Sequence, residues 1–187
     1  AKQGWAEAPY REVPCAPVMA GTLMAVGTHD PRLKVAIVPG LSQMAPPDVM
    51  RGEETQIAGF LAQNPGFEGA ICLPGTHSKW VRIEAGRVVG FTTFMTGELF
   101  AVLCAHTVLR HSLATDGFDE AAFAQAAHEA AIDPARLGRD LFGLRAQALL
   151  ADLAPEAARA RLSGLLIGHE LGLARGYWEG AAVALIG

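Results

Sequence analysis

The stretch that decides the fold is GAICLPGTHSKWVRIEAGRVVGFTT, residues 69–93. Within it, short apolar runs predict three strands, at Gly69–Leu73, Trp80–Glu84 and Arg87–Thr93, because each run is bounded by turn residues. The link between the last two strands is typical of a hairpin, in which Gly86 supplies the positive φ. We therefore expect residues 69–93 to form a β-meander.

The residues before the meander predict strands and one helix. Val18–Gly27 and Val35–Val38 have the apolar character of strands. Pro46-Pro47 blocks a helix, and Asp48 after it predicts the cap of a helix over Val49–Gln63.

The residues after the meander are rich in alanine and predict helices. We expect one helix near Gly97–His106, one after Asp119, one opening at Asp133-Pro134 and one from Pro155 to about Ala174. The chain then closes on a short strand, which its apolar sequence predicts to be buried, at Val183–Ile186.

Glycines recur every four residues near the end of the chain. Because each glycine costs a helix about 1 kcal/mol relative to alanine, the series needs a reason. Close packing of a neighbouring helix or sheet is favoured over a ligand surface. The series consists of Gly164, Gly168, Gly172, Gly176 and Gly180.

The composition excludes several classes of protein. Of 187 residues, 51% are hydrophobic and 18% are charged, so the chain is not intrinsically disordered. The formal net charge is −4, and no run of Lys or Arg could neutralise a nucleic-acid backbone. No apolar run approaches the roughly 20 residues of a membrane span. The three cysteines, Cys15, Cys72 and Cys104, are far apart, which suits a reducing, cytoplasmic location.

The two ends of the sequence suggest a fragment. It begins Ala-Lys-Gln-Gly-Trp without a methionine, and it ends in an apolar run that closes on Gly187. A strand this apolar normally leads to further chain. We expect the 187 residues to be part of a longer protein.

The polar segment Pro74-Gly75-Thr76-His77-Ser78-Lys79 lies between two predicted strands. A glycine turn exposes backbone N–H groups, the two hydroxyls can donate, and the lysine adds charge, which suits a phosphate oxygen. An ordinary polar β-turn is the alternative. No P-loop and no Gly-x-Gly-x-x-Gly motif occurs, and the histidine and cysteine spacings do not predict a metal site.

A second polar segment, Met50–Gln56, contains the adjacent carboxylates Glu53 and Glu54 at a predicted helix start. Carboxylates there usually complement the helix dipole and face solvent. Alternatively, one of them points into a cleft as a general base, with Gly52 allowing close approach of a substrate.

In order and spacing, these segments resemble the second half of a sugar kinase of the actin/hexokinase/Hsp70 superfamily. The resemblance is closest to the 2-dehydro-3-deoxygalactonokinase family and covers most of the chain. It rests on Gln3-Gly4-Trp5, residues 7–10, Val38–Ser42, Asp48–Gln56, Leu73–Trp80, Met95–Phe100 and Leu162–Gly168.

The resemblance implies an ATP-dependent kinase that phosphorylates the terminal hydroxyl of 2-dehydro-3-deoxy-D-galactonate, with Mg²⁺ carried by the nucleotide. Glu53 aligns with the catalytic base, and Glu54 is the reserve candidate. The phosphates would be held by Gly75, Thr76, His77, Ser78 and Lys79, the sugar acid by Gln3, Gly4 and Trp5, and the adenosine turn would include Gly187.

The implied fold is α/β, the ribonuclease H-like ATPase fold of the superfamily. Residues 1–47 would be the tail of the first, sugar-binding lobe, and residues 48–187 most of the second, nucleotide-binding lobe. The first phosphate motif of the superfamily, Asp-x-Gly-Thr, is absent, and the adenosine motif stops at its first glycine. We expect the isolated 187 residues to have little or no kinase activity.

Two alternatives stay open: a kinase for another sugar acid, and a non-catalytic module of the same fold that binds a sugar or a nucleotide. The expected partners are small molecules, the sugar acid and ATP, with neither nucleic acid nor membrane. The sequence does not determine the quaternary state, and a homodimer is one option.

Overall fold

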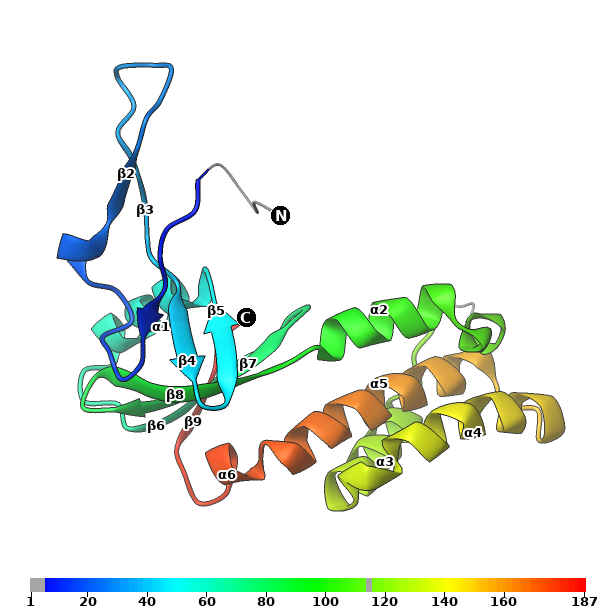
Figure 1. Cartoon of the computed structure of the whole chain (residues 1–187). Helices are drawn as coiled ribbons and strands as arrows, with labels where there is room; N and C mark the ends of the chain where they lie inside the picture. The colour runs from blue at the N-terminus through cyan, green and yellow to red at the C-terminus, as the bar shows by residue number, and fades with distance from the viewer. Residues whose placement is uncertain (1–5, 114–115) are drawn as a thin grey trace. The chain divides into compact units, whose positions relative to one another are not determined.

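The computed structural model describes residues 6–113 and 116–187 as a mixed α/β chain (Figure 1). The chain divides into two compact units. We call the first the sheet unit; it comprises Ala1–Pro74, Lys79–Thr93 and Gly180–Gly187. We call the second the helix unit; it comprises Gly75–Ser78 and Phe94–Glu179. In the described ranges no helix is both long and apolar enough to cross a bilayer.

The sheet unit contains the predicted meander. In its four-stranded sheet the order is β8-β7-β6-β9, with β6 antiparallel to β7 and parallel to β9. A three-stranded sheet has the order β1-β4-β5, and β2 and β3 form a separate antiparallel pair. The elements are β1 Arg11–Glu12, the 3-10 helix η1 Ala20–Thr22, β2 Met24–Val26, β3 Val35–Ile37, β4 Leu41–Met44, β5 Pro47–Met50, α1 Glu53–Gln63, β6 Gly69–Leu73, β7 Ser78–Glu84, β8 Arg87–Phe94 and β9 Val183–Leu185.

The three strands of the meander and their hairpin are confirmed. β6 has the predicted bounds, and β7 and β8 extend the predictions by two residues and one residue. Ala85 and Gly86 between them have φ of 49° and 69°, the pair of positive values that a tight hairpin turn requires.

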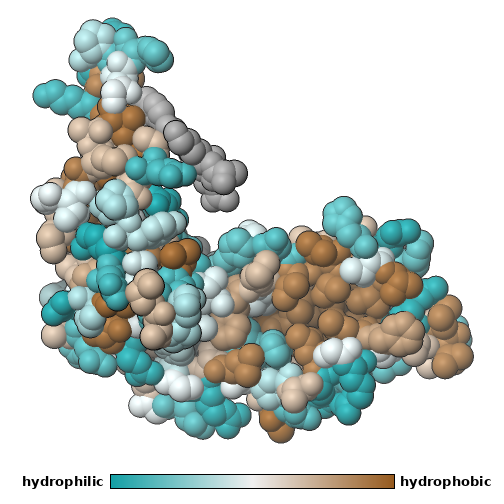
Figure 2. All heavy atoms as spheres, in the orientation of Figure 1, coloured by the Kyte–Doolittle hydropathy of each residue, from teal (hydrophilic) through white to brown (hydrophobic). Residues whose placement is uncertain are grey.

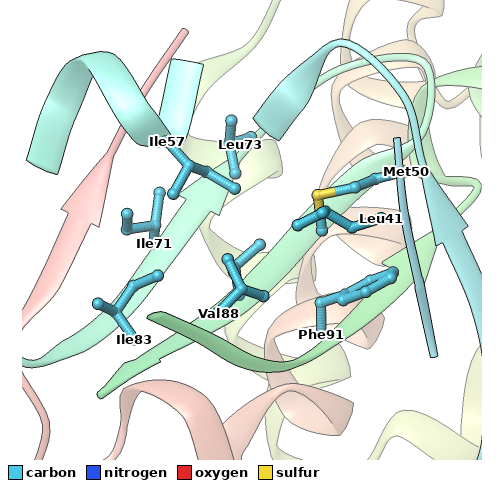
Figure 3. Close-up of a cluster of buried hydrophobic side chains, with 9 residues drawn as sticks. Leu41, Met50, Ile57, Ile71, Leu73, Ile83, Val88 and Phe91 are labelled. Atoms are coloured by element: carbon cyan, nitrogen blue, oxygen red, sulfur yellow. The ribbon is translucent and has the colours of Figure 1, made fainter. Parts of the chain in front are cut away.

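The core of the sheet unit lies between the strands and α1. Figure 3 shows Ile57 of α1 next to Ile71 and Leu73 of β6, with Phe91 of β8 on the side of Leu41 and Met50. All of these side chains are less than 5% exposed. Their burial keeps α1 on the sheet, and with it the two carboxylates that begin the helix.

The predicted helix over Val49–Gln63 is wrong in its first turn. Residues 47–50 form β5, which pairs antiparallel with β4 so that Met50 lies opposite Leu41. The helix begins only at Glu53, after Gly52 at φ 111°. Asp48 therefore does not cap it. The strand is preferred because both Leu41 and Met50 are buried in the core, at 0% and 2% exposure.

Two other strand predictions need correction. Val18–Gly27 is not one strand, because η1 occupies Ala20–Thr22 and only Met24–Val26 pairs with β3. The last strand exists as β9 but is not buried: Val183 is 44% and Leu185 74% exposed. Because side chains alternate between the two faces of a strand, only Ala184 of β9 and Ile186 just after it pack on the core.

The helix unit contains the predicted helices. Asp119 caps α3 through its side chain, which accepts from the N–H of Ala122 at 3.0 Å. Asp133 precedes η3 without such a bond. The elements are α2 Thr96–His106, η2 Val108–Ser112, α3 Glu120–Ile132, η3 Pro134–Arg136, α4 Leu137–Leu150, α5 Pro155–Leu173 and α6 Arg175–Trp178.

The glycine series packs α5 against α3. A β-carbon on Gly164 or Gly168 would come closer than 3.0 Å to the backbone of Phe123 or Ala127 in α3. Gly172 is similarly close to Ala131 and Pro134. The packing interpretation is therefore confirmed for these three glycines. Gly176 has open space around it, and Gly180 follows α6 in a turn at φ 72°, so the series is not one continuous contact.

Candidate functional site

The start of α1 holds both candidate carboxylates of the sheet unit. The side chain of Glu53 accepts a hydrogen bond from the N–H of Arg51 at 3.0 Å. That of Glu54 accepts from the N–H of Gly52 at 2.7 Å. Both carboxylates thus fold back onto free N–H groups at the helix start, where negative charge is favourable.

The two carboxylates differ in how deeply they are buried. Glu54 is 2% exposed, and this burial raises its pKa above the ordinary value, although hydrogen bonds from its own N–H and that of Gly52 act in the opposite direction. The Glu53 side chain is 23% exposed. Of the two, Glu53 is the carboxylate that a bound molecule can reach.

Lys79 lies next to Glu53 in the sheet unit. It is the second residue of β7 and is 5% exposed. Its ammonium group donates to Thr93 Oγ1 at 2.8 Å and to the carbonyl oxygen of Val49 at 3.2 Å. Its Nζ is 4.0 Å from Glu53 Oε1. The fold thus brings together two predicted site residues that are far apart in the sequence.

Asp48 and Thr93 complete this group and were not among the predicted site residues. Asp48 Oδ2 accepts from the N–H of Thr93 at 2.7 Å, and Asp48 Oδ1 accepts from Thr93 Oγ1 at 2.7 Å. Because the sequence predicted Asp48 to cap a helix, its hydrogen bonds with Thr93 were not predicted. The available signal was the pair of threonines, Thr92 and Thr93, near the end of an otherwise apolar strand.

The predicted phosphate loop begins in the helix unit with three exposed residues, Gly75, Thr76 and His77. Ser78 is 4% exposed and starts β7. The carbonyl oxygen of Thr76 accepts from the N–H of Glu98 at 3.0 Å, which fastens the turn to the start of α2.

Two features of α2 hold this turn. His77 Nε2 lies 2.5 Å from Glu98 Oε2, with the two side chains 49% and 41% exposed. Gly97 packs so closely on the turn that a β-carbon would come closer than 3.0 Å to the Gly75 oxygen and to Thr76 Cα. The exposed turn therefore has a defined backbone, as a cradle for an anion requires.

A buried acid supports the same end of α2. Thr96, the first residue of the helix, donates its hydroxyl hydrogen to Glu170 Oε2 on α5. Glu170 is 7% exposed. Sequence reasoning missed it, although an acid within the glycine-rich face of α5 was a signal.

The remaining predicted residues are Gln3, Gly4, Trp5 and Gly187. Gln3, Gly4 and Trp5 fall outside the described residues. Gly187 is exposed at the end of the chain, after β9. The three cysteines are free thiols, and burial raises the pKa of Cys15 and Cys104. Within residues 6–113 and 116–187, no cluster of three or more His, Cys, Asp or Glu could hold a metal ion.

An apolar groove lies on the helix unit, apart from the predicted site residues. Figure 2 shows hydrophobic side chains gathered over the α2 and α4 side of this unit. The groove contains no charged side chain and therefore does not suit a phosphate. It is lined by Leu103, Thr107, Val108, Leu109, Gly138, Leu141 and Phe142.

Comparison with known proteins finds relatives that match all or most of the chain. The chain is 45% identical over 194 aligned residues to "Probable 2-dehydro-3-deoxygalactonokinase DgoK1" of Rhizobium meliloti (strain 1021), covering 100% of this chain and 63% of the relative. It is 37% identical over 177 residues to 2-dehydro-3-deoxygalactonokinase of Escherichia coli (strain K12), covering 93% of this chain and 58% of the relative.

The fold agrees with a solved structure. A crystal structure of a Sinorhizobium meliloti protein, provisionally described as a 2-dehydro-3-deoxygalactonokinase, matches with a TM-score of 0.90 and 45% identity. The match covers 99% of this chain and 63% of that one. The chain thus spans less than two thirds of the length of each of these relatives.

By name, both curated relatives are kinases of a sugar acid. The family model described as 2-keto-3-deoxy-galactonokinase matches residues 1–187. The chain belongs to the 2-keto-3-deoxy-galactonokinase family, which confirms the resemblance drawn from its motifs.

Proposed function

We propose that the full-length protein containing this chain transfers the γ-phosphate of ATP to the terminal hydroxyl of 2-dehydro-3-deoxy-D-galactonate. The observation that carries the proposal is the family match over all 187 residues. The geometry supports it, because the start of α1 presents one reachable carboxylate, Glu53, in a site with a nearby cation.

In this proposal Glu53 is the general base. Its carboxylate takes the proton of the terminal hydroxyl while the oxygen attacks the γ-phosphorus, and the bond from that phosphorus to ADP breaks. Glu54 is the weaker candidate because it is 2% exposed, whereas the Glu53 side chain is 23% exposed. A base within reach of the hydroxyl must be accessible to the substrate.

The turn at Gly75–Ser78 supplies the proposed phosphate contacts, and Lys79 after it, which is buried and bonded to Thr93 and Val49, adds positive charge. Gly75, Thr76 and His77 are exposed, and their backbone N–H groups and the Thr76 hydroxyl suit the negative oxygens of ATP. We propose that Mg²⁺ arrives on the nucleotide, where it neutralises charge on the phosphates. Gln3, Gly4 and Trp5 are proposed for the sugar acid, and Gly187 for the adenosine turn.

The proposal includes the architecture of the complete enzyme. Within the α/β class, the proposed fold is the ribonuclease H-like fold of the actin/hexokinase ATPases. In that architecture residues 1–47 belong to the end of the sugar-binding lobe and residues 48–187 to most of the nucleotide-binding lobe. The strong match to a solved structure supports the common fold with that relative.

The test is ADP release by the full-length protein with ATP·Mg²⁺ and one of three acids: 2-dehydro-3-deoxygalactonate, 2-dehydro-3-deoxygluconate or gluconate. We expect turnover with the first. Glu53→Gln should lower kcat by about 100-fold or more and leave ATP binding intact. Glu84→Gln, an exposed acid at the end of β7, is the matched control and should retain kcat.

Other results would redirect the proposal. Turnover with a different acid would make the protein a kinase for that acid. ATP binding without any turnover would indicate a binding module. If Glu54→Gln abolished turnover and Glu53→Gln did not, the base would be Glu54.

A further inference from the structure

Lys79 carries a charge that is almost fully buried in the sheet unit. The residue is 5% exposed, and a buried ammonium group is unfavourable unless its hydrogens are bonded. The fold supplies a hydroxyl oxygen, Thr93 Oγ1, and a carbonyl oxygen, that of Val49. An ammonium group has three N–H donors, and these acceptors use two of them. The third is left for the carboxylate of Glu53, whose Oε1 lies 4.0 Å from Lys79 Nζ.

Asp48 determines which groups donate and which accept in the hydrogen bonds of the Thr93 hydroxyl. A threonine hydroxyl has one hydrogen, and that of Thr93 is donated to Asp48 Oδ1. The Thr93 oxygen is then available only as an acceptor, and Lys79 donates to it. Asp48 is itself held by the N–H of Thr93 at 2.7 Å. The ammonium is therefore located by β5 and β8 independently of any nucleotide.

The location of the ammonium matters for Glu53. Lys79 and Glu53 form an ion pair whose cation is shielded from water, so the attraction is less screened than at the surface. Together with the hydrogen bond from the N–H of Arg51 at 3.0 Å, the pair restrains the Glu53 side chain, which is 23% exposed.

We infer that Lys79 is a positioning residue for Glu53, in addition to the positive charge it supplies, and that Thr93 and Asp48 hold it in place. The inference rests on the proposed function, because it assigns Lys79 to the proposed base. Lys79 exchanges no proton: the hydroxyl proton goes to Glu53, and ADP leaves with the electron pair of the broken bond.

The test separates this role from phosphate binding. In the full-length protein, Thr93→Val removes the hydroxyl that holds the ammonium and keeps the shape, whereas Thr93→Ser keeps the hydroxyl. Lys79→Met removes the cation itself. Lys34→Met is the matched control, because Lys34 is exposed and lies just before β3. The measurements are kcat and KM at saturating co-substrate, and the Kd of ATP by calorimetry.

We expect Lys79→Met to lower kcat roughly 10-fold or more, as part of the 10²–10⁴-fold that a positioned base contributes. Thr93→Val should also lower kcat, and its Kd for ATP should equal that of the native protein. Thr93→Ser should restore kcat to near the native value, and Lys34→Met should leave it unchanged. This split between kcat and ATP affinity is not expected of a lysine that binds phosphate alone.

A native kcat in Thr93→Val and Lys79→Met, or a loss confined to KM and Kd for ATP, would overturn the inference. Should Lys79→Met fail to show a cooperative melting transition, the comparison of Thr93→Val with Thr93→Ser decides. An active Glu53→Gln would overturn the proposed base and this inference together. An inactive Glu53→Gln with a native kcat in Thr93→Val would overturn this inference alone.

Discussion

The N–H of Glu98, in the first turn of α2, donates to the carbonyl oxygen of Thr76 at 3.0 Å. An N–H in the first turn of a helix has no acceptor within the helix. Here the turn proposed to hold the ATP phosphates supplies that acceptor. The same helix start includes Gly97, which packs on Gly75 and Thr76, and Thr96, which is anchored to Glu170 on α5. The conformation of the turn therefore depends on residues 96–98.

Gly97→Ala should displace this turn. Alanine is normally better than glycine in a helix by about 1 kcal/mol, but here its β-carbon would come closer than 3.0 Å to the Gly75 oxygen. We expect the KM for ATP of the full-length protein to rise about 10-fold, because small misplacements at a binding site are costly. Gly138→Ala in α4, where a β-carbon has no neighbour within 4 Å, should leave this KM unchanged. A native KM in Gly97→Ala would show that the contact does not control the turn.

Gly168→Ala should separate α5 from α3. Its β-carbon would meet the backbone of Ala127, which cannot move without shifting the helix. We expect the free energy of unfolding to fall by about 1–3 kcal/mol, the usual cost of overpacking. Gly143→Ala in α4 has open space and should be neutral or stabilising by up to about 1 kcal/mol. Urea unfolding of the two variants checks the difference, and equal effects would contradict it.

Glu54→Gln should change how stability depends on pH. Burial raises the pKa of Glu54 in the folded chain, so the folded state binds its proton more tightly than the unfolded state. The free energy of unfolding must then fall as the pH rises through the ordinary value of 4.5 toward the higher folded pKa. Glutamine has no proton to lose, and its amide oxygen can still accept from Gly52. The variant should therefore gain stability relative to the native protein as the pH rises.

Thermal unfolding between about pH 4 and pH 8 measures this difference. Glu84→Gln, at an exposed position, is the control and should show a flat difference from the native protein. A flat difference for Glu54→Gln as well would mean that burial does not control the charge of Glu54.

Much of the fold followed from local patterns. Some signals act only on residues within a few positions of themselves and can therefore be predicted from the sequence. Examples are the turn at Gly86, the cap at Asp119 and the proline at the start of α5. The strand β5 was not predictable in this way. Its residues, Pro47–Met50, take strand geometry because β4 pairs with them and because Met50 is buried in the core.

The candidate site was predictable as a set of residue types but not as an arrangement. The sequence marked Glu53, Glu54 and the turn at Gly75–Lys79, and their roles remain predictions. It contained no signal that Lys79 lies beside Glu53, since the rest of α1 and the whole of β6 lie between them in the sequence. It also concealed Asp48, whose partner Thr93 lies 45 residues away.

The sequence by itself determined the mixed α/β class, the meander, the helices and the family, because propensity, turn chemistry and motif order are local properties of the chain. Only the tertiary structure decided which of two adjacent glutamates reaches solvent and which lysine meets it. Burial and ion pairing depend on residues brought together by packing: Ile57 keeps α1 on the sheet, and the contacts of β5 and β8 hold Lys79 next to Glu53.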